Sequence, residues 1–516
     1  MILLKKIVLL ALVIIFCSGD IKSQNEYSVD WGPEYQKTKG VFSTLKLIEM
    51  DDEYYYLLFD NRKSTSIGKF NHQHKLIATK KAPFNYSQHN SNLNKIIHTK
   101  NGTFGYLSSI KDKQWKLYVS RFDQGNFKKL RLIHSHPYRR ELTVGLGWIS
   151  TEGTVDNANE LVISRDSNRV AFTNIIATGD RRNREESFDI AVFDADFKLL
   201  WKRIQKLPYQ DKDLKITQTV ISNEGTIYVL GKLRDRKKNS KGLPSYDFKI
   251  FQITETDVNE FDLRIGESIA PTDVRLYFPS ASSSEILISG FYTDAQRKSG
   301  LKGVFFANGT KEEGVEHIEI HDFEKEFLEG MISDRQLKKD KGLENNYDFG
   351  SLLYFKDGSL GFIAENRYVT QYTSYQNGQS RTRYIYSSED LVIVHFSKEG
   401  ELLSLQKVPK YYSTPGGWDM VTYSLALYND KVYLVFNDNK TYSERKELGT
   451  KSGSIYTDLA VIDENGQLEY HKNLFNNKDI ELYYIPTISA FIDGKLLIGA
   501  MKALTPDYRM GIVNLE

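Results

Sequence analysis

A four-stranded unit in residues 160–208 constrains the fold of this chain more than any other feature. Its four apolar runs begin at Leu161, Val170, Phe188 and Leu199. Tight turns join the first run to the second and the third to the fourth, and a charged loop separates the two hairpins. This pattern predicts one small antiparallel sheet whose two faces need neighbours.

The same unit recurs along the chain, with turn sequences spaced by roughly 50 to 75 residues per repeat. Eight units occupy residues 41–84, 88–135, 157–208, 213–265, 272–323, 347–411, 420–476 and 482–516. The last unit lacks a fourth strand, which residues 26–35 are placed to supply. Because an open sheet edge invites aggregation and circular closure removes it, we predict an all-β chain that forms a single propeller. It has four-stranded antiparallel blades, most simply eight, closed by both termini, with seven as the alternative.

One segment departs from the strand pattern. In residues 323–346, Phe323, Phe327 and Met331 recur at helical spacing, which predicts one short helical insertion that packs on the propeller. The sequence Asp463-Glu464-Asn465-Gly466 lacks the carboxylate spacing of a calcium loop and is interpreted as a hairpin turn.

The first residues are typical of an export signal. Lys5 and Lys6 precede an apolar run over 7–16, and small residues follow. We predict a signal peptide at 1–23, a propeller domain at 24–516 and a periplasmic or extracellular location. Lipid anchoring through Cys17 is the alternative, although the bulky residues just before it are unusual for such a signal.

Composition excludes several function classes. Cleavage after residue 23 removes the only cysteine. It also removes three lysines and one aspartate, which takes the formal net charge from +2 to zero. A neutral chain does not predict nucleic acid as a partner. The mature chain is expected to lack a disulfide, a transmembrane span and a cofactor, and to be a monomer.

The turn Ser164-Arg165-Asp166-Ser167-Asn168 resembles the Ser-Pro-Asp-Gly turn of propeller repeats in periplasmic TolB-type proteins, with Arg165 where proline is usual. More broadly, residues 188–209, 328–340 and 347–440 resemble a family of uncharacterised exported proteins of Bacteroidetes-type bacteria. The resemblance implies the fold and the compartment, and it implies no activity.

Catalytic motifs are absent from the sequence: it has no Gly-x-Ser-x-Gly elbow, no His-Glu-x-x-His and no phosphate-binding glycine loop. His317, Glu319 and His321 would share one strand face as a weak metal candidate. Solvated polar residues on an outer strand are the simpler interpretation, so no metal site is predicted.

Long loops are predicted to gather on one end of the disc, here called the long-loop face. The strongest candidate there is residues 366–390, where Asn377-Gly378 indicates a hairpin with tyrosines and arginines on both arms. Such residues are enriched at binding hot spots. The predicted partner-binding residues are Tyr368, Tyr372, Tyr375, Arg381, Arg383, Tyr384 and Tyr386.

Polar residues that end the second strands should ring the mouth of the central channel on the same face. These candidates for ligand binding are Asp60, Asn174, Lys232, Glu365, Asn437 and Asp438. Two functions are compatible with the sequence. The favoured one is an exported, non-catalytic scaffold that binds an envelope protein or a glycan. The alternative is a propeller hydrolase or lyase that acts on glycans at the channel mouth.

Overall fold

The structure is a computed structural model. It describes residues 27–35, 44–60, 65–84, 95–112, 114–137, 159–178, 185–210, 213–238, 244–266, 268–278, 285–294, 300–310, 314–376, 379–439, 455–502 and 507–515. The predicted signal peptide at 1–23 and Cys17 lie outside these residues. None of the helices in these ranges has the length and hydropathy to span a bilayer.

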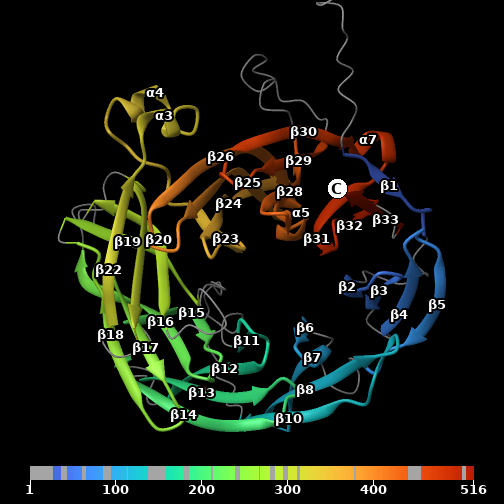
Figure 1. Cartoon of the computed structure of the whole chain (residues 1–516), viewed down its shortest axis with the longest axis horizontal. Helices are drawn as coiled ribbons and strands as arrows, with labels where there is room; N and C mark the ends of the chain where they lie inside the picture. The colour runs from blue at the N-terminus through green and yellow to red at the C-terminus, as the bar shows by residue number, and fades with distance from the viewer. Residues whose placement is uncertain are drawn as a thin grey trace, which may run out of the picture.

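The described strands form eight antiparallel sheets arranged in a ring (Figure 1). From the innermost strand outward, sheet one contains β2 (Thr44–Met50), β3 (Tyr54–Asp60), β4 (Thr65–Asn71) and β5 (Leu76–Lys81). Sheet two contains β6 (Lys95–Thr99), β7 (Gly102–Lys111), β8 (Gln114–Asp123) and β10 (Arg131–Pro137), with β9 (Asn126–Phe127) beside β8. Sheet three contains β11 (Asn159–Ile163), β12 (Arg169–Thr178), β13 (Glu185–Asp194) and β14 (Leu199–Gln210), and sheet four contains β15 (Leu214–Ile221), β16 (Ile227–Lys238), β17 (Pro244–Ile253) and β18 (Val258–Leu263).

Sheets five to eight follow the same order. Sheet five contains β19 (Ile269–Tyr277), β20 (Ile286–Asp294), β21 (Gly303–Thr310) and β22 (Gly314–Asp322), and sheet six contains β23 (Tyr347–Tyr354), β24 (Leu360–Gln376), β25 (Gln379–Phe396) and β26 (Leu402–Thr414). Sheet seven contains β27 (Tyr423–Tyr428), β28 (Lys431–Asp438), β29 (Tyr456–Ile462) and β30 (Leu468–Asn476). Sheet eight contains β31 (Tyr483–Ile492), β32 (Lys495–Met501) and β33 (Tyr508–Asn514), with β1 (Val29–Trp31) outermost.

Both ends of the chain build the eighth sheet. β1 pairs antiparallel with β33, with Val29 opposite Val513 and Trp31 opposite Gly511. The indole of Trp31 packs edge-on against Phe475 of the neighbouring sheet, with ring centres 5.2 Å apart. The prediction of eight blades closed by both termini is therefore confirmed.

The core is divided among the blade interfaces. Eight apolar clusters occur in the described residues, and each joins two neighbouring sheets, including the last sheet to the first. Middle strands lie between two such clusters, so they are apolar without a break: Val432 to Phe436 in β28 are all buried. Full burial of one such side chain contributes about 1.5–3 kcal/mol, and the interfaces repeat this around the ring.

The insertion between sheets five and six contains two one-turn helices, α3 (Lys325–Leu328) and α4 (Asp334–Leu337). Figure 1 shows them at the outer rim, beyond β22 and β26. Gly330, with φ of 79°, interrupts the helical course, and Ser333 starts α4 with a capping box. The predicted helical periodicity is thus split in two. Two further single turns are α5 (Trp418–Val421) and α7 (Asn477–Ile480).

Short turns join the first strand to the second and the third strand to the fourth, and these turns lie on one face of the disc. The Asp463 turn connects β29 to β30, and its carboxylate Oδ1 accepts hydrogen bonds from the amides of Asn465 and Gln467, as expected for a hairpin. On the same face, the Arg165 guanidinium lies 3.5 Å from the ring centre of Tyr354, so a turn of sheet three reaches sheet six.

Candidate functional site

Two strands of sheet six extend far beyond their neighbours. β24 and β25 have 17 and 18 residues, whereas β23 has 8. Pairing of β24 with β23 stops at Asn366, and pairing of β25 with β26 stops at Tyr386. Beyond these points β24 and β25 pair only with each other, as far as Gln376 and Gln379. We call residues 367–376 and 379–386 the ribbon. The predicted turn at 377–378 lies outside the described residues.

The register divides the predicted binding residues between two faces of the ribbon, because directly opposite residues point to the same side. Tyr372 lies opposite Arg383, and Val369 lies opposite Tyr386. The arginine face therefore contains Tyr368, Thr370, Tyr372, Ser374, Arg381, Arg383 and Ile385. The tyrosine face contains Arg367, Val369, Gln371, Thr373, Tyr375, Thr382, Tyr384 and Tyr386.

The arginine face is open to solvent. Tyr372 is 59% exposed, and Arg381 and Arg383 are also exposed. Neither guanidinium has a hydrogen-bond or ion-pair partner among the described residues. Nearer the disc, the hydroxyl of Tyr368 donates to the Glu389 carboxylate over 2.6 Å. Burial and this carboxylate raise the pKa of Tyr368, so Tyr368 is an anchored part of the ribbon.

The tyrosine face is exposed at its tip and packed at its base. Tyr375 and Tyr384 are 78% and 50% exposed. Tyr386, by contrast, packs edge-on against Trp418 of α5, with ring centres 5.1 Å apart. The Arg367 guanidinium lies 4.1 Å from the same indole. Trp418 therefore supports the ribbon where it leaves the disc.

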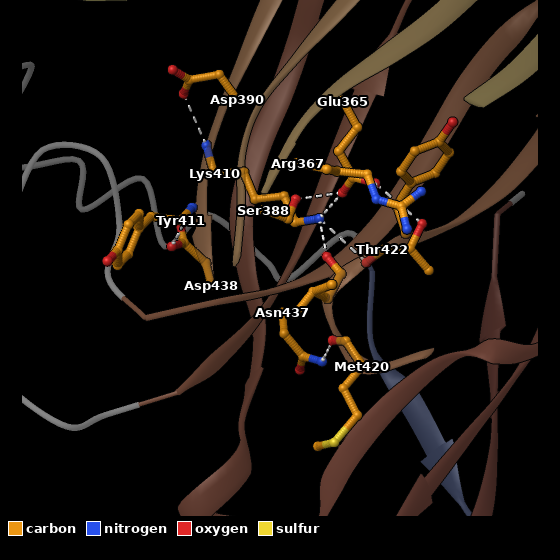
Figure 2. A network of polar contacts seen from close by, with 12 residues as sticks. Glu365, Arg367, Ser388, Asp390, Lys410, Tyr411, Met420, Thr422, Asn437 and Asp438 are labelled. Atoms are coloured by element: carbon orange, nitrogen blue, oxygen red, sulfur yellow. Dashed lines mark hydrogen bonds and ion pairs between the residues drawn. The ribbon is translucent and has the colours of Figure 1, made fainter. Parts of the chain in front are cut away.

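A buried ion pair lies directly beneath the ribbon (Figure 2). Lys410 of β26 donates from Nζ to Glu365 Oε1, to the carbonyl of Val421 and, over 3.3 Å, to the carbonyl of Thr422. Ser388 donates to Glu365 Oε1 over 2.5 Å, and the Thr422 hydroxyl to Oε2 over 3.3 Å. The Lys410 side chain is 0% exposed and that of Glu365 is 2%.

Burial lowers the pKa of Lys410, and the Glu365 carboxylate opposes that shift. A lysine with a lowered pKa is a recurring feature of catalytic sites. Here, however, three acceptors surround the ammonium group, which is the arrangement that a buried cation needs for stability. The pair therefore fixes β24, β26 and α5 relative to one another.

Asn437 and Asp438 end β28 beside this pair. Asn437 Nδ2 donates to the carbonyls of Met420 and Tyr484, over 3.0 and 2.9 Å. Asp438 accepts from the Tyr411 amide over 3.1 Å. Both side chains are 0% exposed, and their contacts connect sheet seven to α5, β26 and sheet eight.

The remaining channel-mouth candidates lie in other sheets. Asp60 ends β3, Asn174 is half-buried in β12, and Lys232 of β16 donates to the Thr272 carbonyl of sheet five over 2.7 Å. Three of the candidates therefore make the same kind of contact, a hydrogen bond to the next sheet or to the segment that leads into it: Lys232, Glu365 and Asn437. The structure brings Glu365, Asn437 and Asp438 together and leaves the other three apart. Ligand binding by these residues stays a prediction.

Three important residues escaped the sequence analysis. Lys410 lies on an outer strand, where a lysine normally faces solvent, and its partner Glu365 is 45 residues away along the chain. Arg367 and Trp418 meet only in the folded chain. The one available signal was the pair Gly416-Gly417 before Trp418, which marks a break between strands.

The metal candidate is not assembled. His317 Nε2 lies 3.0 Å from Glu319, but His321 Nε2 lies 3.3 Å from the carbonyl of Gly400. Across the described ranges, no three His, Cys, Asp or Glu side chains converge as metal ligands would.

The fold defines the class of protein as an eight-bladed β-propeller. No protein-family model matches the sequence, and a search of curated proteins finds no match either.

Among solved structures, the chain is similar to the Dos1 propeller, at 12% identity and a TM-score of 0.40, with 94% of this chain and 95% of that chain covered. It is similar to the polysaccharide lyase Uly1, at 9% identity and a TM-score of 0.37, covering 97% and 94%. A third similar structure is prolyl oligopeptidase B from Galerina marginata, at 10% identity and a TM-score of 0.36, covering 90% of this chain and 56% of that chain. At these scores the fold assignment depends on the sheet topology of this chain itself. The resemblance to TolB-type repeats and to exported proteins of Bacteroidetes-type bacteria stays a prediction.

Proposed function

We propose that this protein is an exported, non-catalytic propeller scaffold that binds an envelope protein or a glycan through its long-loop face. The observation that carries the proposal is the ribbon of β24 and β25. It extends beyond the sheet to which it belongs and exposes Tyr372, Tyr375 and Tyr384. Exposed tyrosines on a supported strand pair provide contact area at a low cost in side-chain entropy, which suits recognition.

The state of Glu365 supports the non-catalytic part of the proposal. A general acid or base must come within about 3 Å of a substrate atom. Both carboxylate oxygens of Glu365 accept hydrogen bonds from side chains of this chain, and the residue is 2% exposed. It therefore stabilises the base of the ribbon.

The second candidate function, a hydrolase or lyase for glycans at the channel mouth, has one specific observation in its favour. Asp348 lies exposed on the innermost strand β23, in register with Glu365. Although the residue as a whole reaches solvent, neighbouring atoms crowd its carboxyl group, and this partial desolvation is the main cause that raises its pKa. Asp273 and Glu365 add to the shift, and Arg367 opposes it. An acid with a raised pKa suits proton transfer.

An affinity pull-down from envelope extract tests the leading proposal. Two immobilised chains that both begin at Gln24 are compared: one has an intact ribbon, and in the other a short turn replaces residues 369–385. Retention of a component by the intact chain alone is expected. If neither chain retains anything, the scaffold proposal fails.

A polysaccharide activity screen tests the second candidate, with Asp348→Asn as the paired variant. Because Asp348 is exposed, this substitution should leave the fold intact, unlike a substitution at Glu365. Loss of a measurable activity in Asp348→Asn would favour the enzyme. An activity that this substitution leaves unchanged would remove Asp348 from consideration.

A further inference from the structure

We infer that the ribbon binds an extended segment of a partner protein that carries acidic side chains at alternate positions, added as a strand beside β25. This inference rests on the proposed function and names the kind of partner. Three properties of the ribbon carry it: a strand edge with no described strand beside it, two exposed arginines without a partner among the described residues, and the absence of Asp and Glu from residues 366–388.

Within the described part of the chain, no strand pairs with the edge of β25 that faces away from β24 over residues 379–385. There β25 pairs with β24 alone, because β26 ends at the pair of Thr414 with Tyr386. A strand edge of this kind presents backbone amides and carbonyls in a row, and an added strand satisfies them. A sugar chain has no matching row of amides and carbonyls, so the edge favours a polypeptide.

The charges along this edge favour an acidic partner. Arg381 and Arg383 both point to the arginine face, because they lie two residues apart on one strand. No Asp or Glu occurs in residues 366–388, and neither guanidinium has a partner among the described residues. Exposed arginines without counter-charges are typical of surfaces that recognise anionic groups.

The spacing of the charges matches a strand. Side chains two residues apart on a strand are separated by about 6.8 Å. A strand added beside β25 repeats this spacing and places its side chains directly opposite, at Cβ separations of about 4.5–5.5 Å. Glutamates at alternate positions would thus face Arg381 and Arg383 together. Tyr372, on the same face, would flank them with its exposed ring.

The test measures fluorescence anisotropy of labelled eight-residue peptides with the mature chain. The main probe alternates threonine with glutamate. The control probes alternate threonine with lysine, or keep the acidic composition with the glutamates gathered at one end. The alternating acidic peptide should bind at least tenfold more tightly than either control. Alternate backbone N–H groups of the bound peptide would point toward β25, and the others would point away from it. Methylating the set of nitrogens that faces β25 should weaken binding of the alternating acidic peptide at least tenfold.

Protein variants locate the site. Arg381→Glu combined with Arg383→Glu should weaken the acidic peptide at least 30-fold and allow the lysine peptide to bind. Lys338→Glu with Lys339→Glu makes the same change in net charge at the exposed end of α4 and should have no effect. Tyr375→Ser, on the tyrosine face, should change affinity less than threefold.

Several results would overturn the inference. Equal binding of all acidic peptides, whatever their pattern or methylation, would mean charge attraction without strand addition. Tight binding of a uronic-acid oligosaccharide in place of the peptides would make the partner a glycan. Ribbon-dependent dimerisation of the chain would make the occupant a second copy. If no peptide binds but the intact ribbon still retains an envelope component, the proposed function stands and this inference fails.

Discussion

At the scale of single residues, the buried Lys410–Glu365 pair shows how position decides the role of a charge. The same two residue types at Lys431 and Glu469 also form an ion pair, with a nitrogen–oxygen distance of 2.7 Å, but there both side chains remain partly exposed. Water screens an exposed pair, whereas a buried charge depends wholly on its partner.

Substitution Lys410→Met should therefore lower the free energy of unfolding by about 3–5 kcal/mol, because it leaves the buried Glu365 carboxylate with only the more distant Arg367 guanidinium, 3.8 Å away, as a cation. Lys431→Met is the matched control and should cost less than about 1 kcal/mol. Urea titration followed by tryptophan fluorescence measures both. Adding Glu365→Gln to Lys410→Met should recover part of the loss; equal losses at the two lysines would contradict this account.

His74 links the first sheet to the chain terminus that closes the ring. Its Nδ1 lies 3.0 Å from the Tyr55 hydroxyl and its Nε2 lies 3.1 Å from the Asp30 carbonyl. The residue is 1% exposed and has φ of 60°. Burial lowers the pKa of His74, and the Asp30 carbonyl opposes the shift.

Because the folded state holds His74 neutral, the unfolded chain binds more protons once the pH falls below about 6.5. Stability should therefore decrease between pH 7 and pH 5. His98 and His395 act in the same direction, since burial also lowers their pKa values. His74→Asn, which tolerates the positive φ, should give a shallower fall in melting temperature over this range. An unchanged slope would show that His74 is not one of the titrating groups.

At the scale of elements, the ribbon behaves as an addition to sheet six. Its outer half is exposed on both faces, while its base is held by Trp418 and by the Lys410–Glu365 pair. The exposed surface and the folding contacts thus lie at different ends of the same two strands.

Replacing residues 369–385 with a two-residue turn should consequently change the free energy of unfolding by less than about 1 kcal/mol, as for exposed segments that lack buried contacts. Circular dichroism and thermal melting measure this. Trp418→Ala, at the base, should destabilise by about 2–4 kcal/mol because its contacts with Tyr386 and Arg367 are lost. A large loss from the shortened ribbon would mean that its tip contributes to the core.

At the scale of the whole molecule, closure of the ring buries a face of the first sheet against a face of the eighth, both of which a linear row of blades would leave exposed. β1 covers β33, and Lys502 pairs with Glu34 and Asp507 near the same junction. The two ends of the chain therefore depend on each other.

A chain that begins at residue 36 lacks β1 and should expose the edge of β33. We expect it to self-associate, because unpaired edges template further pairing, and to melt at a lower temperature. Light scattering after size exclusion compares it with the chain that begins at residue 24. A monomer of unchanged stability would argue that closure contributes little.

Arg165 makes a second contact between distant sheets. Its guanidinium stacks on Tyr354 of sheet six and donates to the Phe278 carbonyl of sheet five over 3.4 Å. Arg165→Ala should cost about 1–2 kcal/mol, whereas Arg264→Ala, with a side chain 85% exposed, should cost almost nothing. Chemical denaturation separates them. Arg165→Lys should recover only part of the loss, since an ammonium group stacks less well.

The sequence by itself determined the blade and the closure by both termini, and it favoured eight blades over seven. These follow from local signals: apolar runs, turn residues such as Asp463 and Gly466, and a last unit one strand short. It also indicated the hairpin of sheet six. Alternation within each strand implied two faces, but only the register of β24 against β25 decided which tyrosines accompany the arginines.

The tertiary structure alone decided what the polar residues do. From the sequence, Glu365 was predicted to lie at the channel mouth, and no sequence signal singled out Lys410. Pairing of β24 and β26 with the two sides of β25, together with the packing of α5 on β25 and β26, buried both side chains and made each the partner of the other. Contacts of this kind join residues far apart along the chain and depend on the exact approach of neighbouring sheets. Periodicity and turn residues are signals that extend over only a few positions, so they do not predict contacts between distant residues.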